Sequence, residues 1–548
     1  MNDQIENSSA FALLYLVALT AAAIVAPMCF LGNASGHDFQ PHLASWIEVT
    51  NQWHEGILVP RWAAGANYGF GEPRFIFYPP LSAFIGAALG LVLPWKVVPG
   101  IYVWLCVTGA GVALWLSVRE WLSPARAIAA ALFFAANPYH LALIYYRSAY
   151  AELLASVFFP FVVAGVLSAM RGQWSRSPVL AVAFAAVWLS NAPAAVVTTY
   201  SIALMLAVGC VAVRSVRPLV TGAVSMIAGL GLAAFYLVPA WWEQRWIQIA
   251  EAVSTTYNPE HNFLFTRANE AEFNQFNWKI SAVAVTLIAL IAIAVAFSRH
   301  LRRQRSELWW MLLTLSILAV LLLLPVSAVV WRYLPELRFL QFPWRWLLVL
   351  GFTFAIFAAA VKNRPAIAWL SFAIVVAACA MTIAGDTSWD SEDVPALVAD
   401  AQDVRGYEGI EGFQPKGVNV DELDEENPLV GEVDPDSGDI DSPDTAKIEV
   451  KSWGTEEKNF VVRTDEPVRL AVRLLHYPAW ELSVDGKRIE PEATTQTGQL
   501  AFNVTPGSHQ VELHFRRTRD RLIGGFISLV TALAVGIFVA RKVIHRRR

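Results

Sequence analysis

The feature that most constrains this fold is a series of apolar runs, each close to the ~20 residues that a helix needs to cross a bilayer. The runs cover 11–31, 97–118, 125–145, 151–170, 178–191, 194–213, 218–239, 279–298, 308–325, 345–361, 366–384 and 522–540. A shorter run at 80–94 either adds a span or lies in the membrane interface. Backbone polar groups inside lipid must be satisfied within their own segment, so such runs form helices. The sequence therefore predicts an α-helical polytopic membrane protein with about 12–13 transmembrane helices.

The charged residues divide the chain into two unequal parts. Residues 385–517 hold 29 acidic and 12 basic residues, a net charge of −17 within a chain whose total is −4. The other residues carry a net charge of +13, mostly as Lys and Arg in short loops between apolar runs. Basic loops stay on the cytoplasmic side of a membrane. The acidic block and the loop 32–79 are therefore predicted to lie on the extracytoplasmic side.

The pattern of apolar residues changes after the membrane runs. From 446 to 515 apolar and polar residues alternate, which is typical of short antiparallel strands, and Asp485-Gly486 favours a two-residue hairpin turn. This pattern predicts a small C-terminal exported β-sandwich. Along the chain, the sequence predicts a polytopic transmembrane domain (1–384) with the first exported loop 32–79, an exported acidic linker (385–445), the β-sandwich (446–518), and a C-terminal transmembrane helix with a basic cytoplasmic tail (519–548).

The stretch 421–444 has eleven acidic residues and no basic one. Its segment DPDSGDID resembles a calcium loop, because closely spaced carboxylates are the ligands that Ca²⁺ prefers. The register does not fit an EF-hand, since Gly438 stands at the fifth position and Thr445 at the twelfth. The alternative, which we favour, is a solvated acidic linker.

The first exported loop carries the most informative polar residues. Asp38 follows directly on the first apolar run, and His42 comes one helical turn later, so the two side chains share a face. The segment 41–57 is predicted to form an amphipathic helix in the membrane interface, with Trp46 on its apolar face and Glu48 on its polar face. The Gly-, Pro- and aromatic-rich run 60–80 is predicted to be an ordered loop.

Ionisable residues near the membrane surface point to function, because they are expensive to bury there. The candidates are Asp38, His42 and Glu152 as catalytic groups, and Arg61, Arg147, Arg338 and Arg345 as substrate-binding groups. Arginine offers paired donors to phosphate, and a carboxylate takes a proton from an attacking hydroxyl or holds a metal. This set suits a lipid substrate that carries phosphate. The alternative for each arginine is a structural pair with a neighbouring acid or a lipid headgroup.

Several short motifs occur in a fixed order along the chain. They are GILVPRW (56–62), NYGFGEP (67–73), FYPPL (77–81), RSAYAE (147–152), LSNAP (189–193), FYLVPA (235–240) and LQFPWR (340–345). In this order the chain resembles bacterial membrane proteins described as 6-pyruvoyl-tetrahydropterin-synthase-related. The name suggests pterin chemistry, but the sequence offers no zinc-binding His cluster in a soluble fold, so we do not expect that chemistry. The segment HYPAWELSVDGK (476–487) looks like the closing domain of large bacterial membrane proteins proposed to move or attach sugars.

The layout also resembles GT-C glycosyltransferases, which combine many spans with a long first exported loop that starts with an acid. This resemblance implies transfer of a sugar from a polyprenyl-phosphate donor in the bilayer to a glycan or protein acceptor, on the extracytoplasmic face of a bacterial inner membrane. It implies that Asp38 acts as base or metal ligand, with a divalent cation as the candidate cofactor, and that Arg345 or Arg338 holds the donor phosphate. Many relatives show two adjacent acids where this chain has His37-Asp38-Phe39. The single acid favours direct base catalysis, or a site completed by Glu152 and His42.

Two other functions stay open at this point, a lipid-linked sugar transporter (flippase) and a non-catalytic envelope scaffold. Gly/Pro interruptions such as Asn137-Pro138 are compatible with transport. The charges, however, gather in the exported loops and not in the spans, which favours the enzyme. Nucleic-acid binding is not expected, because topology explains the short basic loops and no recognised motif accompanies them.

Overall fold

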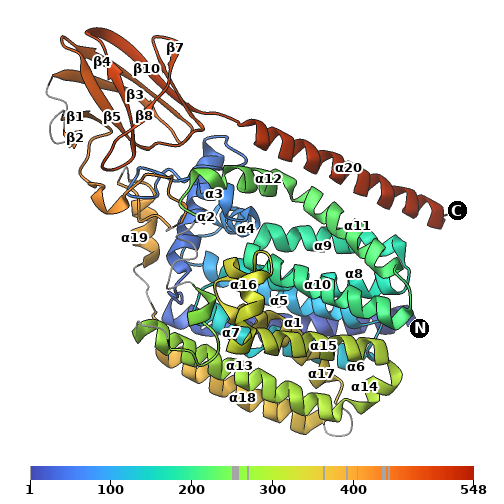
Figure 1. Cartoon of the computed structure of the whole chain (residues 1–548). Helices are drawn as coiled ribbons and strands as arrows, with labels where there is room; N and C mark the ends of the chain where they lie inside the picture. Colours follow the sequence, from blue (N-terminus) through green and yellow to red (C-terminus); the bar gives the residue numbers. More distant parts are fainter. Residues whose placement is uncertain are drawn as a thin grey trace.

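A computed structural model describes residues 2–249, 258–267, 271–361, 365–389, 393–403, 405–410, 412–434, 440–441 and 445–547. Figure 1 shows a bundle of helices with a β region at one end, and a last helix that leaves the β region and runs along the outside of the bundle. Residues 435–439 of the candidate calcium run lie outside the described residues.

Within the part of the chain that the structure describes, nineteen α-helices precede the β region. Those of the first half are α1 (Asn2–Leu31), α2 (Phe39–His54), α3 (Arg74–Phe77), α4 (Pro80–Gly90), α5 (Val98–Val118), α6 (Pro124–Ala135), α7 (Pro138–Tyr145), α8 (Tyr150–Met170), α9 (Ser177–Ser190), α10 (Ala192–Val213), α11 (Arg217–Leu232) and α12 (Ala234–Glu243). The others are α13 (Ala271–Phe297), α14 (Arg299–Gln304), α15 (Ser306–Leu322), α16 (Ala328–Tyr333), α17 (Leu347–Ala359), α18 (Pro365–Asp386) and α19 (Asp393–Asp400). Helix α8 packs against α5 and α9 in the middle of the bundle.

The polytopic helical fold is confirmed, with fewer clear spans than the about 12–13 expected. Among the described residues, seven helices are long and apolar enough to cross a membrane, and nine if each bent pair counts as one span. The bent pairs are α11 with α12, at 75°, and α15 with the segment 325–333, at 89°. The run at 80–94 forms the 11-residue helix α4, which is too short to cross a bilayer. Local breaks and short helices therefore account for the difference.

The β region consists of two five-stranded antiparallel sheets. One sheet has the order β2 (Ile440–Asp441), β1 (Val430–Val433), β5 (Val468–Leu475), β9 (Gln499–Val504), β8 (Glu492–Ala493). The other has the order β3 (Ala446–Trp453), β4 (Glu457–Thr464), β10 (Gly507–Phe515), β6 (Trp480–Val484), β7 (Lys487–Ile489). The predicted hairpin at Asp485-Gly486 joins β6 to β7, and both turn residues have positive φ, 51° and 74°. Strands β1 and β2 precede residue 446, where the predicted sandwich began.

The first loop lies between the bundle and the β region. The Trp62 ring packs against Tyr477, Trp480 and Phe515 of the β region. The Phe70 carbonyl accepts a hydrogen bond from the Leu475 backbone N–H, at 3.0 Å. The ordered loop predicted for 60–80 thus joins the two parts of the molecule. Helix α20 (Arg519–Arg547) then returns to the bundle and packs on α11 and α12.

Helix α2 is present as predicted, but its predicted polar face, which carries Glu48, is buried in the protein. Glu48 is 5% exposed and accepts hydrogen bonds from the Gly65 N–H, at 2.6 Å, and the Tyr407 hydroxyl, at 3.1 Å. Trp46, on the opposite face, is fully buried as well. The loop after α2 and a segment more than 350 residues away cover the polar face of this helix, so α2 belongs to the core.

Candidate functional site

The candidate site is built on two loops that meet where the bundle faces the β region. Asp38 is the residue before α2, and Arg147 lies between α7 and α8. The Asp38 N–H donates to the Arg147 carbonyl at 2.8 Å, and the Arg147 Nη2 donates to the Asp38 carboxylate at 2.5 Å. The loops approach closely because Gly36 has no side chain: a Cβ there would stand 2.5 Å from the Tyr146 carbonyl oxygen. Backbone and side chain therefore both fix Asp38 against Arg147.

A second carboxylate–arginine pair lies beside the first. Glu152, in the first turn of α8, is buried, and one of its oxygens accepts a hydrogen bond from the Tyr139 hydroxyl. Its other oxygen lies 3.8 Å from the Nε of Arg345, which precedes α17. Arg345 also lies close enough to Asp38 to act on its charge. We call Asp38, Arg147, Glu152 and Arg345 together the charged cluster.

Two aromatic rings support both guanidinium groups. The Arg147 guanidinium lies 4.8 Å from the Trp344 ring centroid, and that of Arg345 lies 5.3 Å from Phe342. Phe342 and Trp344 stack on each other at 4.9 Å. A cation over an aromatic face is held without using its N–H groups. The rings thus position the arginines and leave their hydrogen-bond donors available.

Several donors in the charged cluster have no partner. The Nε and Nη1 atoms of Arg147 and of Arg345 are buried and make no hydrogen bond with the residues that the structure describes. The 3.8 Å between Arg345 and Glu152 is an ion-pair distance but too long for a hydrogen bond. Buried donors without acceptors cost free energy, so each such group needs an explanation. An anionic ligand with several oxygens would supply the missing acceptors.

The electrostatics of the cluster set the protonation states of Asp38 and His42. Burial acts to raise the pKa of Asp38, but the positive charges of Arg147 and Arg345 act against it and the pKa is lowered, so Asp38 is ionised at neutral pH. The Asp38 side chain is 35% exposed, against 7% for Arg147, so the carboxylate is the accessible side of the pair. Burial lowers the pKa of His42 to about 4, which leaves the imidazole neutral.

Of the seven predicted site residues, the structure brings five together: Asp38, His42, Arg147, Glu152 and Arg345. Arg61 lies instead on the side of the β region, where its charge interacts with Arg521, Glu456 and Glu243 and where burial lowers its pKa to about 10. Arg338 is exposed, with its guanidinium 4.9 Å from the Phe339 ring. The roles assigned to all seven residues stay predictions.

The sequence did not single out three aromatic features of the site. Tyr139 bonds Glu152, and Tyr78 packs its ring 5.9 Å from that of His42. The Tyr78 pKa is raised by burial and by the nearby Asp38 charge, so its hydroxyl is protonated. The Phe342/Trp344 stack is the third. The only sequence signal was that these residues occur within the Pro-containing motifs NPY, FYPP and FPW. An aromatic residue in such a motif is as compatible with packing as with chemistry.

No group of three or more His, Cys, Asp or Glu side chains converges as metal ligands within the described part of the chain. Asp38 and Glu152 each face an arginine. The donor set of the charged cluster therefore fits an anion better than a cation.

A second buried arginine–carboxylate cluster lies under the β region. Arg521, at the start of α20, donates through Nε and Nη2 to both oxygens of Glu243, at 2.7 and 2.9 Å, and through Nη1 to the Arg516 carbonyl, at 3.2 Å. The hydroxyls of Tyr477 and Thr518 donate to the same carboxylate. We call this cluster the latch, because it ties α12, the β region and α20 together.

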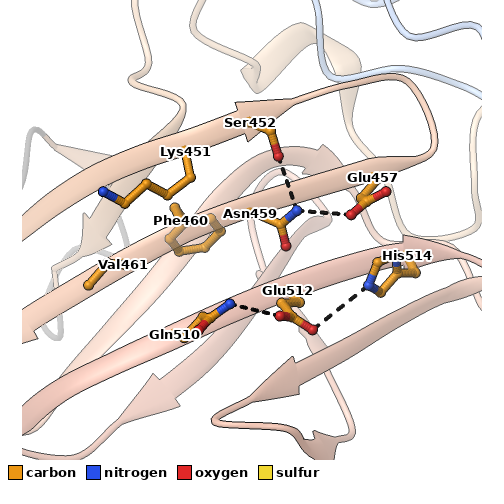
Figure 2. Close-up of a pocket in the computed structure, with 9 residues that line it drawn as sticks. All are labelled: Lys451, Ser452, Glu457, Asn459, Phe460, Val461, Gln510, Glu512 and His514. Carbon is orange, nitrogen blue, oxygen red and sulfur yellow. Dashed lines mark hydrogen bonds and ion pairs between the residues drawn. The ribbon is translucent and has the colours of Figure 1, made fainter. Parts of the chain in front are cut away.

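The β region has a hollow of about 460 Å³ whose lining, from β3, β4 and β10, is mostly polar, with Phe460 and Val461 as its apolar members (Figure 2). Its side chains bond one another: the Asn459 amide donates to Ser452 and Glu457, and the Gln510 amide donates to Glu512. Such a satisfied polar surface is what the solvent face of a sheet requires. The charged cluster, in contrast, has unpaired buried donors.

A comparison with protein families identifies the family of this chain. The model of the 6-pyruvoyl-tetrahydropterin synthase related domain, described as a membrane protein, matches residues 75–390. The chain belongs to this family. The region matched to the related domain includes Arg147, Glu152 and Arg345, whereas Asp38 and the β region lie outside it. No curated protein matches the chain.

The solved structures to which this chain is similar are distant from it in sequence, and the structural similarities are weak. The arabinofuranosyltransferase AftD from Mycobacteria is 17% identical, with a TM-score of 0.43 over 71% of this chain and 27% of that one. An oligosaccharyltransferase of Archaeoglobus fulgidus is 14% identical, with a TM-score of 0.39 over 73% of this chain and 54% of that one. The archaeal enzyme AglB has also been solved with an inhibitory peptide and a dolichol-phosphate, and its TM-score is 0.37 at 14% identity. This chain spans between about a quarter and just over half of the length of these proteins.

Proposed function

We propose that this membrane protein is a glycosyltransferase that moves a sugar from a polyprenyl-phosphate donor to a hydroxyl of a glycan or protein acceptor. The transfer would take place at the membrane face that carries the β region, which we place on the extracytoplasmic side of a bacterial inner membrane. The observation that carries this proposal is the pair of buried arginines with unpaired donors beside an accessible, ionised carboxylate.

The arginines would hold the donor phosphate. Four buried nitrogens of Arg147 and Arg345 lack acceptors among the described residues, and the oxygens of a phosphodiester would complete their hydrogen bonds. The bond between the anomeric carbon of the sugar and the phosphate oxygen breaks during transfer, and negative charge grows on the departing lipid phosphate. Donors fixed in advance on an aromatic support stabilise that charge without reorganising. A pair of arginines in this position lowers the barrier for departure of the lipid phosphate.

Asp38 would accept the proton of the acceptor hydroxyl while the hydroxyl oxygen bonds to the anomeric carbon. Arg147 now holds this carboxylate and lowers its pKa, which makes it a weak base. A phosphate that takes donors of Arg147 weakens this restraint, and its negative charge raises the proton affinity of Asp38. Donor binding would therefore prepare the base. Positioning of the acceptor must still supply much of the rate, because a carboxylate has limited strength.

Glu152 and His42 would act as supporting groups. Glu152 balances the charge of Arg345 and is fixed by Tyr139. His42 is neutral and packed between aromatic rings, so it would orient Asp38 and would not compete with it for the proton. If a divalent cation takes part, Asp38 is the residue of this cluster that is accessible enough to bind it.

The test is an Asp38→Asn variant, assayed in membranes with polyprenyl-phosphate sugars by release of lipid phosphate. Removing a general base costs about 10²–10⁴ in rate, and the amide keeps the size of the side chain. A matched control is Glu120→Gln, which removes an exposed carboxylate that pairs with Arg176 far from this cluster in the sequence. Full activity of Asp38→Asn would refute the assignment.

A lipid-linked sugar transporter is the second candidate, because two helix pairs are bent by 75° and 89°. Broken helices are common at transporter binding sites. The same assay separates the two functions, since a transporter moves the lipid-linked sugar across the membrane without releasing lipid phosphate.

A further inference from the structure

Ser148, which follows Arg147 in the loop between α7 and α8, has a backbone conformation that serine rarely adopts. Its φ is 49°, in the left-handed region, where glycine is relaxed and a residue with a Cβ is strained. The side chain is fully buried. Strain of this kind persists only where the surrounding structure fixes it, and it gathers at functional sites. A glycine here would remove the strain, so the reason for a serine lies in its side chain.

The Ser148 hydroxyl bridges two backbone groups of the loop that carries Asp38. It donates to the Ala34 carbonyl at 2.7 Å and accepts from the Gly36 N–H at 3.0 Å. A glycine at this position could form neither hydrogen bond. The hydroxyl therefore holds the segment 34–36 against the loop of Arg147, two residues before Asp38.

The contacts of Ser148 continue directly into the pair of Asp38 and Arg147. The Asp38 N–H donates to the Arg147 carbonyl at 2.8 Å, in the peptide bond that joins Arg147 to Ser148. A Cβ at Gly36 would lie 2.8 Å from the Ser148 nitrogen, so no side chain fits between the two backbones. The position of the Asp38 carboxylate relative to Arg147 thus depends on where Ser148 holds the chain.

We propose that Ser148 is a positioning residue of this site, whose hydroxyl fixes the Asp38 loop so that the carboxylate meets the acceptor hydroxyl. This deepens the proposed function and rests on it for the chemical step. A carboxylate is a weak base, so much of the rate must come from its placement, and a displacement of about 1 Å costs about 10²-fold in rate. Ser148 acts through Asp38 and not on the substrate.

The Asp38 loop has a second set of contacts that does not involve Ser148. The Ser35 N–H donates to the Ser388 carbonyl at 2.9 Å, and the Ser35 hydroxyl donates to the Asp393 carboxylate at 2.6 Å. Substitution of Ser148 therefore loosens the loop on one side only, and we expect the variants to fold.

Two substitutions separate the hydroxyl from the backbone strain. Ser148→Ala removes the hydroxyl and keeps a strained residue, whereas Ser148→Gly removes both, so the glycine variant should be the more stable of the two. In membranes both should lower kcat for sugar transfer about 10²-fold and change KM for the polyprenyl-phosphate donor less than about twofold. The matched control Ser201→Ala removes a buried hydroxyl that donates to the Val197 carbonyl within α10, and it should keep full kcat. If kcat instead follows stability, so that the glycine variant regains activity, Ser148 is only structural and the proposal is overturned.

Hydrogen–deuterium exchange of the full chain in nanodiscs follows the loop without an assay of transfer. Two hydrogen bonds are lost, each worth a factor of about five, so exchange of the peptide 32–39 should rise about 25-fold in both variants. Exchange of the β10 peptide (507–515) should not change. Wild-type exchange of 32–39 in the glycine variant overturns the proposal, because the hydroxyl would then hold nothing. A wild type that transfers no sugar but shows this difference in exchange refutes the proposed function and leaves Ser148 as the residue that fixes the loop.

Discussion

The charged cluster and the latch both join buried arginines to carboxylates, yet the hydrogen bonds of the two sets are completed to different degrees. In the latch, Arg521 uses Nε, Nη1 and Nη2, and the Glu243 carboxylate accepts four hydrogen bonds. In the charged cluster, Arg147 bonds Asp38 through a single nitrogen, and Arg345 makes no hydrogen bond through Nε or Nη1 to any residue that the structure describes. A completed network stabilises one arrangement, whereas an incomplete one can accept a ligand. The difference separates a structural role from a binding role within one molecule.

The largest effect is expected from a substitution in the charged cluster. Arg147→Gln should lower sugar transfer about 10²–10³-fold, because it removes donors aimed at the leaving phosphate. The unfolding temperature in detergent should change little, since Asp38 is partly exposed and can be solvated when its partner is lost.

The matched control is Arg521→Gln in the latch, which should show the reverse: reduced stability, and transfer that scales with the folded fraction. Equal losses of transfer in the two variants, each with normal folding, would contradict the division of roles.

The variant Glu243→Gln tests the structural role of the latch. The buried Arg521 would lose its charge partner, and we expect the free energy of unfolding to fall by about 2–3 kcal/mol. Release of the β region should precede unfolding of the bundle, because the latch joins them. Thermal unfolding together with limited proteolysis between 393 and 434 measures both effects. A variant that keeps wild-type stability but loses transfer would place Glu243 in the chemistry instead.

His42 contributes a smaller, pH-dependent effect. Its folded pKa of about 4 lies below its usual value of 6.5, chiefly through burial, so between these values the unfolded state binds more protons than the folded state. Stability should therefore fall as the pH drops from about 6.5 to 4, by at most about 1.4 kcal/mol per pH unit. Unfolding measured at several pH values for the wild type and His42→Gln checks this, and the variant should show a flatter profile. A wild-type profile as flat as that of the variant would mean that His42 is solvated.

The sequence predicted the helices well because the length and apolarity of a run are local properties. Pairing between distant segments was harder to predict. Glu48 was predicted to lie on the polar face of an interfacial helix, but the hydroxyl of Tyr407, more than 350 residues later, donates a hydrogen bond to its carboxylate. Such burial depends on the tertiary fold and leaves no trace in the periodicity of α2.

The same limit applies to the site residues. Asp38, Arg147, Glu152 and Arg345 were predicted from their charge next to membrane runs, and the structure brings them together. Arg61 meets the same criterion but lies near the latch, because the loop that carries it packs on the β region. Charge near the membrane surface identifies candidates, and only the fold decides which cluster each one joins.

The smallest expected effect is that of a substitution at Tyr139, which tests whether this residue positions Glu152. The Tyr139 hydroxyl donates to one oxygen of Glu152, which leaves the other oxygen directed at Arg345. Tyr139→Phe removes this donor, and we expect about a fivefold loss of turnover and a loss of about 1 kcal/mol in stability. Tyr102→Phe is a matched control, because that buried hydroxyl bonds Ser82, at 2.9 Å, and the Tyr150 carbonyl, at 3.3 Å, and none of the four residues of the charged cluster. It should lower stability by a similar amount and leave turnover unchanged. If both variants reduced turnover equally, Tyr139 would act through general packing and not by positioning Glu152. The unpaired donors of Arg345 would then need an explanation that does not depend on the position of Glu152.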